Sequence, residues 1–249
     1  MTGWPDGYGR HVLQSVDSTL SEAARMAADA SGPVWIMAEQ QTAARGRRGR
    51  PWAMPAGNFA ATLLLPVSEA PGQAALRSFV ASLALYEALV AATGRADIFA
   101  LKWPNDVLLR GGKLAGILLE SAGQGAQLRH LAIGIGVNLA AAPGADEVEA
   151  GAVRPVSLKG ELGTVIAPEE FLDLLAEAYA RFETQFTTYG FAPIRSAWLN
   201  HAARLGEVIT ARTTRDETTG TFAEVDGAGN LVLETSRGRV AIAAADVYF

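Results

Sequence analysis

Large apolar side chains recur at helical spacing in the longest periodic segments of the chain. Between residues 168 and 188 they fall three or four apart, with glutamates in the first turn, which predicts an amphipathic helix. Residues 71–93 are rich in alanine and leucine, and Pro71 suits a first helical turn, so a buried helix is predicted there. Shorter helices are predicted at residues 19–30 and 194–203.

Short apolar runs separated by glycine and polar residues predict the strands of a sheet. From Val12 to Leu65 strands alternate with one helix, and the middle of the chain has the pattern of an antiparallel sheet. Gly111-Gly112 between two such runs predicts a tight hairpin. Residues 141–163 hold two prolines and are predicted to be a loop. The predicted strands are residues 34–38, 58–65, 106–109, 113–120 and 130–139.

The pattern changes near Arg204. From residue 206 to residue 249 the chain is rich in threonine and β-branched residues, with turn signals at 226–230 and 236–238. Four or five short strands in this segment predict a small β-barrel appended to the main domain. The predicted domains are therefore residues 1–204 and residues 205–249.

Composition narrows the class of protein. Of 249 residues, 49% are hydrophobic and 19% are charged, as in a packed globular domain. Cysteine is absent, which excludes disulfides, thiolate metal sites and a cysteine nucleophile, and the three histidines lie far apart. No apolar run is expected to reach the ~18–20 residues of a membrane span, and the N-terminus does not have the pattern of a signal peptide. A cytoplasmic protein without membrane contact is expected.

Positive charge is concentrated at one place in an acidic chain. The formal net charge is -5, yet four arginines interleaved with glycines lie between Arg45 and Arg50. Arginine forks onto phosphate or carboxylate oxygens, and glycine lets the backbone approach a ligand. The run is compatible with a solvated turn, with RNA binding, or with closure over a phosphorylated or adenylated small molecule. The single basic run and the lack of a nearby aromatic array disfavour RNA.

A second cluster surrounds the predicted hairpin. Lys102, Asn105, Asp106 and Lys113 lie within twelve residues and can converge at one end of the sheet, although each alone is also an ordinary turn or strand-end residue. Carboxylate and amide oxygens suit Mg²⁺, and lysine suits an acyl or phosphate oxygen. Gly134-Ile135-Gly136 lacks the third glycine of a dinucleotide fingerprint, so these glycines indicate close approach of a ligand or another backbone.

The ordered set of these motifs resembles the biotin–protein ligases, also called biotin–[acetyl-CoA-carboxylase] ligases. The resemblance is carried by Asp17-Ser18-Thr19, the loop from Gln41 to Arg50, Trp52, and the block from Lys102 to Asp106, followed by the runs 113–120 and 134–139. It covers roughly residues 12–140 by motif and the whole chain by layout. It implies an α/β fold of the α+β type: a mixed, largely antiparallel sheet packed with helices, followed by a small SH3-like β-barrel.

The resemblance implies a role for each matching residue. Arg45, Gly46 and Arg47 would form a loop that closes on biotin and its adenylate, and Lys113 would hold the biotin carboxyl or the acyl oxygen. Catalysis would rest on Lys113, Arg45, Arg47 and Asp106, and Asp106 would also meet Mg²⁺. The biotin-binding residues would be Ser18, Thr19, Gln41, Arg45, Gly46, Arg47, Lys113 and Gly116. The ATP-binding residues would be Arg47, Arg50, Trp52, Lys102, Asn105 and Asn138.

The implied reaction has two steps. Biotin and ATP give biotinyl-5′-AMP, and a lysine of a biotin carboxyl carrier domain, of acetyl-CoA carboxylase or a related carboxylase, then takes the biotinyl group. Some members carry an N-terminal helix-turn-helix domain. This chain begins near the catalytic domain, so ligase activity without DNA binding is expected, and a homodimer is possible. A lipoate or octanoate ligase or transferase of the same superfamily is the nearest alternative enzyme.

The chain departs from the family pattern at two positions. Ala44 stands where the family usually has glycine, and Leu20 stands where it usually has asparagine. Alanine is expected to stiffen the arginine loop or shift its closure.

Overall fold

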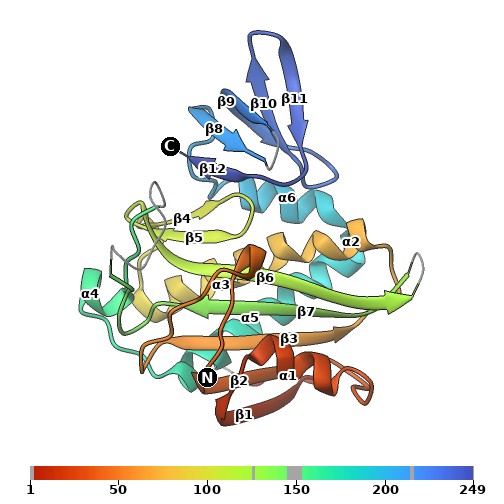
Figure 1. The fold of residues 1–249 in the computed structure, drawn as a ribbon, viewed down its shortest axis with the longest axis vertical. Coiled ribbons are helices and arrows are strands. Elements are labelled where there is room, and N and C mark those ends of the chain that lie inside the picture. The colour runs from red at the N-terminus through yellow and green to blue at the C-terminus, as the bar shows by residue number, and fades with distance from the viewer. Residues whose placement is uncertain (1–2, 125–126, 145–152, 214–215, 249) are drawn as a thin grey trace.

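A seven-stranded sheet forms the centre of the molecule in a computed structural model that describes residues 3–124, 127–144, 153–213 and 216–248. The strand order is β1-β2-β3-β7-β6-β5-β4 (Figure 1). The first two strands are parallel and every other neighbouring pair is antiparallel, which confirms the predicted mixed sheet. The strands are β1 (Gly9–Val16), β2 (Val34–Gln41), β3 (Phe59–Pro66), β4 (Phe99–Lys102), β5 (Asp106–Leu109), β6 (Gly112–Gln124) and β7 (Gln127–Val137).

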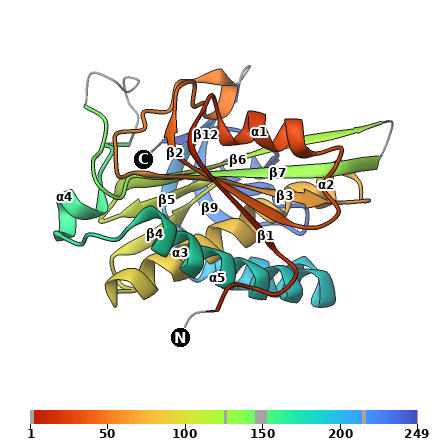
Figure 2. The same ribbon diagram turned by 90° about the horizontal axis from the view of Figure 1, so that it is seen from below.

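Helices cover the two faces of this sheet unequally. The main core lies under α3 (Arg77–Thr93) and α5 (Pro168–Tyr189), while α1 (Thr19–Met26) packs alone on the opposite face (Figure 2). On the α1 side, Leu20 and Ala23 pack with residues of β2, β3 and β7 in a small separate cluster. The short helix α1 thereby places its N-terminus at the end of β2, beside the arginine loop, since Thr19 N donates to Gln41 Oε1 at 2.8 Å.

The segment from Pro71 to Thr93 has the length and composition of a membrane-crossing helix, and the expectation that no run reaches that length was wrong. In the structure 72% of its most apolar window is buried inside the molecule. It forms two helices, α2 (Pro71–Ala75) and α3. Arg77 at the start of α3 is buried and pairs with Glu183 of α5 and with Glu69. The segment is therefore part of the core, as its richness in alanine and leucine predicts.

Several predicted boundaries need correction. Helix α1 ends at Met26 rather than at residue 30. The hairpin turn between β5 and β6 is centred on Arg110 and Gly111, both at positive φ, so Gly112 already belongs to β6. The predicted loop 141–163 contains α4 (Leu158–Leu162), which is capped by Ser157 Oγ; residues 145–152 of that loop lie outside the described residues. Helix α6 (Phe191–Leu199) begins before its predicted start.

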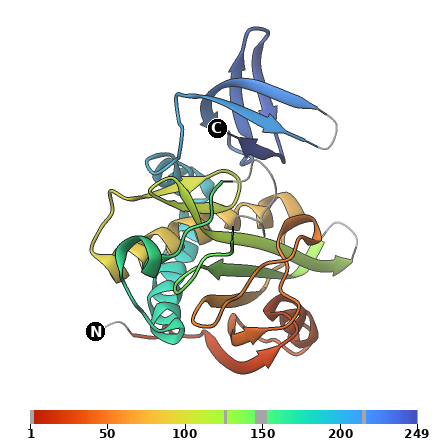
Figure 3. The same cartoon turned by 60° about the vertical axis from the view of Figure 1, so that its left-hand side comes forward.

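The C-terminal segment forms a separate five-stranded antiparallel sheet, in the order β11-β10-β9-β8-β12, next to α6 and β4 (Figure 3). Its turns at 226–230 and 236–238 fall where the sequence predicts them. Trp103 Nε1 donates to Gly229 O at 3.1 Å and Arg195 Nη1 to Val225 O at 3.2 Å, which joins this sheet to the main body. The strands are β8 (Val208–Arg212), β9 (Glu217–Val225), β10 (Leu231–Thr235), β11 (Gly238–Ile242) and β12 (Asp246–Tyr248).

Candidate active site

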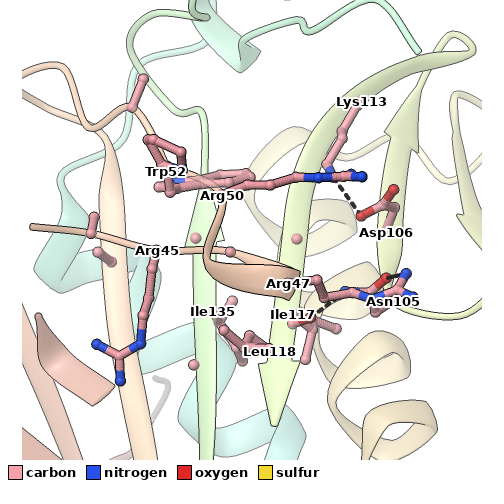
Figure 4. A pocket seen from close by; sticks show the side chains of 18 of the residues that line it. Arg45, Arg47, Arg50, Trp52, Asn105, Asp106, Lys113, Ile117, Leu118 and Ile135 are labelled. Atoms are coloured by element: carbon pink, nitrogen blue, oxygen red, sulfur yellow. Dashed lines mark hydrogen bonds and ion pairs between the residues drawn. The ribbon is translucent and has the colours of Figure 1, made fainter. Parts of the chain in front are cut away.

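One pocket of about 390 Å³ collects every residue that the sequence marks as a candidate for binding or catalysis. It lies between the N-terminus of α1, the arginine loop, strands β5 to β7 and the start of β12. Figure 4 shows the side chains of the loop beside Asp106 and Lys113. The candidates that line it are Ser18, Thr19, Gln41, Arg45, Gly46, Arg47, Arg50, Trp52, Lys102, Asn105, Asp106, Lys113, Gly116 and Asn138.

Two paired glycines form part of the pocket floor. Gly116 of β6 and Gly136 of β7 are register partners, and the indole of Trp52 lies against both. A Cβ at Gly136 would come within 2.7 Å of Trp52 Nε1, and one at Gly134 within 2.9 Å of Leu20 Cδ1. The predicted close neighbour of these glycines, a ligand or a backbone, is thus a side chain in this structure. Glycine is needed because the indole and the leucine must reach the strand surface.

Leu20 fits this floor. It is 4% exposed, lines the pocket, and fills the space above Gly134. The resemblance leads us to expect asparagine here, and the structure accommodates an apolar residue because Leu20 packs in one buried cluster with Ile36, Leu64 and Ala132. The departure therefore extends the apolar lining of the pocket rather than leaving a buried polar group unpaired.

The polar end of the pocket is built around Gln41. Its Oε1 accepts from Thr19 N at 2.8 Å and from Thr19 Oγ1 at 3.2 Å, and Thr62 Oγ1 donates to Thr19 Oγ1 at 2.8 Å. Ser18 is the N-cap of α1, and its side chain makes no capping hydrogen bond. The side chains of Gln41, Thr19 and Ser18 therefore offer neutral donors and acceptors here, which suits a neutral amide-like ligand.

The cationic end is organised by Asp106. Lys113 Nζ lies 2.7 Å from Asp106 Oδ1, and Lys102 Nζ lies 3.9 Å from Asp106 Oδ2 (Figure 4). Lys113 Nζ is also 5.7 Å from the centroid of the Trp52 ring. Burial lowers the pKa of Lys102, and the carboxylate of Asp106 counteracts that shift in part. Two ammonium groups with one carboxylate leave a net positive charge for an anionic ligand.

The same geometry bears on Mg²⁺. Asp106 lies between two ammonium groups, which disfavour a cation at its oxygens. Among the described residues, no group of three or more His, Cys, Asp or Glu side chains could hold a metal ion. The predicted contact of Asp106 with Mg²⁺ stays a prediction, since a magnesium ion that arrives with ATP needs only one or two protein carboxylates.

The arginine loop is held by acids from two directions. Arg45 bonds both carboxylate oxygens of Glu120 at 3.0 and 2.8 Å, which raises its pKa, and Figure 4 shows its side chain directed away from Lys113 and Asp106. Arg47 lies closer to the cationic end, with Nη1 3.4 Å from Asn105 Oδ1, and burial lowers its pKa. Asp246 of β12 pairs with the guanidinium groups of Arg47, Arg48 and Arg50.

Asn138 lines the pocket and is also part of a buried hydrogen-bond network. Its Nδ2 donates to Val156 O at 3.1 Å, and its Oδ1 accepts from Asn58 Nδ2 at 3.4 Å. Asn58 Oδ1 accepts from the backbone of Ala140 and Ala141 at 2.9 and 3.0 Å. Sequence reasoning did not single out Asn58, which appears in the sequence only as the start of a predicted strand.

Comparisons with known proteins agree with this geometry. Residues 12–138 match the Biotin/lipoate A/B protein ligase family, and residues 205–249 match the Biotin protein ligase C terminal domain. A biotin–[acetyl-CoA-carboxylase] ligase from Paracoccus denitrificans is 57% identical over 96% of this chain and 99% of its own length. The chain belongs to the biotin protein ligase family. For this ligase, the RNA-binding interpretation of the arginine loop and the lipoate interpretation of the fold are therefore not retained.

More distant relatives of the ligase extend the comparison. The Bifunctional ligase/repressor BirA of Bacillus subtilis is 30% identical over 96% of this chain and 74% of its own length. A biotin protein ligase structure from Aquifex aeolicus in complex with biotin and ATP is 25% identical, has a TM-score of 0.81 and covers 96% of this chain and 98% of that one. The shared fold thus extends through both sheets.

Asp246 is a charged pocket residue that sequence reasoning missed. It lies 196 positions after Arg50 in the sequence, in a segment predicted only as part of a barrel. Nothing in its local sequence marks it as functional. Val247 and Tyr248 line the pocket beside it. The C-terminal sheet therefore completes one wall of a site whose motifs all lie in the first 140 residues.

Proposed function

We propose that this ligase uses ATP to attach biotin to one lysine of a biotin carboxyl carrier domain through biotinyl-5′-AMP. The main support for this proposal is that fourteen candidate residues line one pocket, which has a neutral polar end and a cationic end. The names of the relatives supply the chemistry, because they are biotin–[acetyl-CoA-carboxylase] ligases and ligase/repressors. In this proposal residues 1–204 carry most of the site and residues 205–249 contribute its last wall.

The two ends of the pocket match the two ends of the proposed intermediate. The ureido ring of biotin has amide donors and acceptors that suit Thr19 and Gln41, and its aliphatic chain suits the apolar lining between the ends. The carboxylate and the phosphates suit Lys113, Lys102 and Arg47. The apolar lining residues between the two ends are Leu20, Ile117, Leu118 and Ile135.

The first step joins two anions. A carboxylate oxygen of biotin attacks the α-phosphorus of ATP, the bond between the α-phosphorus and its bridging oxygen to the β-phosphorus breaks, and pyrophosphate leaves. No protein nucleophile is needed, so the chain contributes position and charge. Lys113 neutralises the carboxylate and the acyl oxygen, while Lys102 and Arg47 neutralise the phosphates.

In the second step the carrier amine attacks the acyl carbon, the bond to the phosphate oxygen breaks, and AMP leaves with the electron pair. The amine loses a proton as the amide forms, and the Asp106 carboxylate or solvent accepts it. Asp106 is the candidate that orients this amine, since its carboxylate already holds Lys113 at 2.7 Å. The adenylate reacts with water, so the arginine loop has the further task of excluding solvent.

In this proposal Mg²⁺ enters the pocket bound to ATP. The metal neutralises the phosphates when bound there. Lys102, Asn105 and Arg47 are the residues of this chain that would meet the phosphate side of the pocket. Because the reaction consumes ATP and modifies a carboxylase, we place the ligase in the cytoplasm.

The test is incubation of the protein with MgATP, biotin and a carrier domain, followed by intact-mass and peptide analysis. We expect one biotinyl group on a single carrier lysine and ATP–pyrophosphate exchange that depends on biotin. Lipoate in place of biotin is the matched control and should support neither. Equal exchange with lipoate, or no transfer to the carrier with biotin present, would contradict the proposal.

A further inference from the structure

Arg48 is the one arginine of the loop for which the resemblance implies no role. In the structure its Nη1 lies 2.7 Å from Asp246 Oδ2. The same carboxylate lies 3.4 Å from Arg47 Nη1 and 3.6 Å from Arg50 Nη2. Arg47 Nη2 also donates to Ala245 O at 3.2 Å. Three of the four loop arginines thus meet at the start of one C-terminal strand.

Backbone hydrogen bonds close the loop, from Gly46 N to Arg50 O at 2.8 Å and from Trp52 N to Ala44 O at 3.0 Å, but packing adds little. The turn formed by residues 47–49 buries none of its residues. Arg48 has φ 56° and ψ 25°, and Gly49 follows with φ 71°, so two consecutive residues are left-handed. That conformation is disfavoured for a residue with a Cβ and persists only where other contacts enforce it. For Arg48 the 2.7 Å ion pair to Asp246 is such a contact.

Asp246, in contrast, sits on a fixed support. It is the first residue of β12 and pairs with Arg212 of β8 in the register of the C-terminal sheet. Its neighbours Ala245 and Val247 are both buried in the core. The backbone of Asp246 is therefore held by the sheet, while its side chain, 18% exposed, is directed to the loop. Because three guanidinium groups meet one carboxylate, a net positive charge remains available to an anionic ligand.

We propose that Asp246 is a positioning residue that holds the arginine loop over the pocket, so that retention of the adenylate depends on the C-terminal sheet. The inference rests on the proposed function of the loop as the cover over biotinyl-5′-AMP. It assigns Arg48 to the anchor and Arg47 to both the anchor and the ligand. It also gives the appended sheet a direct part in the reaction.

The test measures how fast preformed biotinyl-5′-AMP leaves the protein. In Asp246→Asn we expect release roughly tenfold faster, since up to three partly exposed ion pairs are lost. We expect Asp246→Glu to restore most of the retention, and the KM for biotin to change little, because Asp246 does not lie at the Gln41 end. High salt should speed release from the unmodified protein more than from Asp246→Asn, since the lost ion pairs are the ones that salt screens.

Glu234→Gln is the matched control. It removes the same charge from the same sheet, and its partner is Arg239 at 3.0 Å, outside the pocket. Release from this variant should equal that of the unmodified protein. Arg48→Gln removes the loop side of the shortest pair, so it should speed release about threefold and add little in combination with Asp246→Asn. Arg48→Gln also keeps the test decisive if Asp246→Asn does not fold.

The outcomes separate the two proposals. Faster release in Asp246→Asn with rescue by glutamate supports the anchor. Unchanged or slower release in both Asp246→Asn and Arg48→Gln overturns the anchor. Asp246 would then either compete with the ligand phosphate for the arginines or have no effect on retention. In that case Arg47→Gly in the same assay decides the rest: if it releases adenylate quickly, only the anchor is wrong. If it does not, the proposed role of the loop is wrong as well.

Discussion

The two halves of the pocket are built in different ways. The sheet half is rigid: Ile117 and Ile135 are nearly fully buried, and Trp52 lies on the glycine pair Gly116 and Gly136. In the loop half no residue between Arg47 and Gly49 is fully buried, and ion pairs to Glu120 and Asp246 help to hold it. Ion pairs at partly exposed sites are weak and exchange readily, whereas a packed core does not. The difference indicates a fixed floor that binds the ligand and a movable cover that retains it.

The largest expected effect is at the fixed half. Lys113→Ala should slow biotin-dependent ATP–pyrophosphate exchange by about 100-fold or more, because a preorganised charge at the reacting oxygen is lost. Lys159→Ala is the matched control, since Lys159 is an exposed lysine on α4 that does not line the pocket. Equal exchange rates in the two variants would contradict the assignment of Lys113 to the reacting end.

The floor itself is tested by Gly136→Ala. The added Cβ would lie 2.7 Å from Trp52 Nε1 in a well-packed site, so the free energy of unfolding should fall by about 1–3 kcal/mol. Urea unfolding measures this. Gly72→Ala in α2 adds the same methyl group where no atom lies within 4 Å, and it should leave stability unchanged or raise it. Equal stability in the two variants would show that the indole is free to move.

The movable half is tested by Arg47→Gly. We expect about tenfold faster release of the adenylate and biotin on many lysines of bystander proteins, since the cover is weakened. The free energy of unfolding should change by no more than ~0.5 kcal/mol, because the loop has no buried residue. Unchanged selectivity for the carrier lysine would count against a retaining loop.

The smallest expected effect is a pH dependence. Burial lowers the pKa of Lys102 below its ordinary value of 10.5, so this lysine loses its proton earlier than an exposed one as the pH rises. The alkaline decline of pyrophosphate exchange should begin below that pH, and Lys102→Arg should move it upward. Between the lowered pKa and 10.5 the folded protein binds fewer protons at this group than the unfolded chain, so its contribution to stability rises with pH. If exchange declined at the same pH in the unmodified protein and in Lys102→Arg, the decline would belong to another group.

Much of the pocket was predictable because its motifs are local. Asp106 and Lys113 lie on one hairpin, so a turn only one residue from its predicted place still brings them together. Helix α5 follows directly from apolar periodicity, and α3 from a long run rich in alanine and leucine. The order of motifs then placed the loop and the start of α1 at the same site.

What sequence reasoning missed depends on contacts between distant segments. The pairing of Asp246 with Arg48 spans 198 positions and has no local signal. Trp52 covers Gly136 from another part of the chain, whereas the glycines were interpreted as marking a ligand or another backbone. Helix α4 is short and is set by the cap of Ser157, which the two prolines of its loop obscured.

Hydrogen exchange measured by mass spectrometry tests the central claim, a fixed floor beneath a movable cover, most directly. With biotin and MgATP added, the amides of residues 44–52 should exchange markedly more slowly, while those of β6 and β7, already protected, should change little. Asp246→Asn should reduce the ligand-induced protection of the loop and leave the strands unaffected. Protection that appears in β6 and β7 but not in the loop would contradict the account.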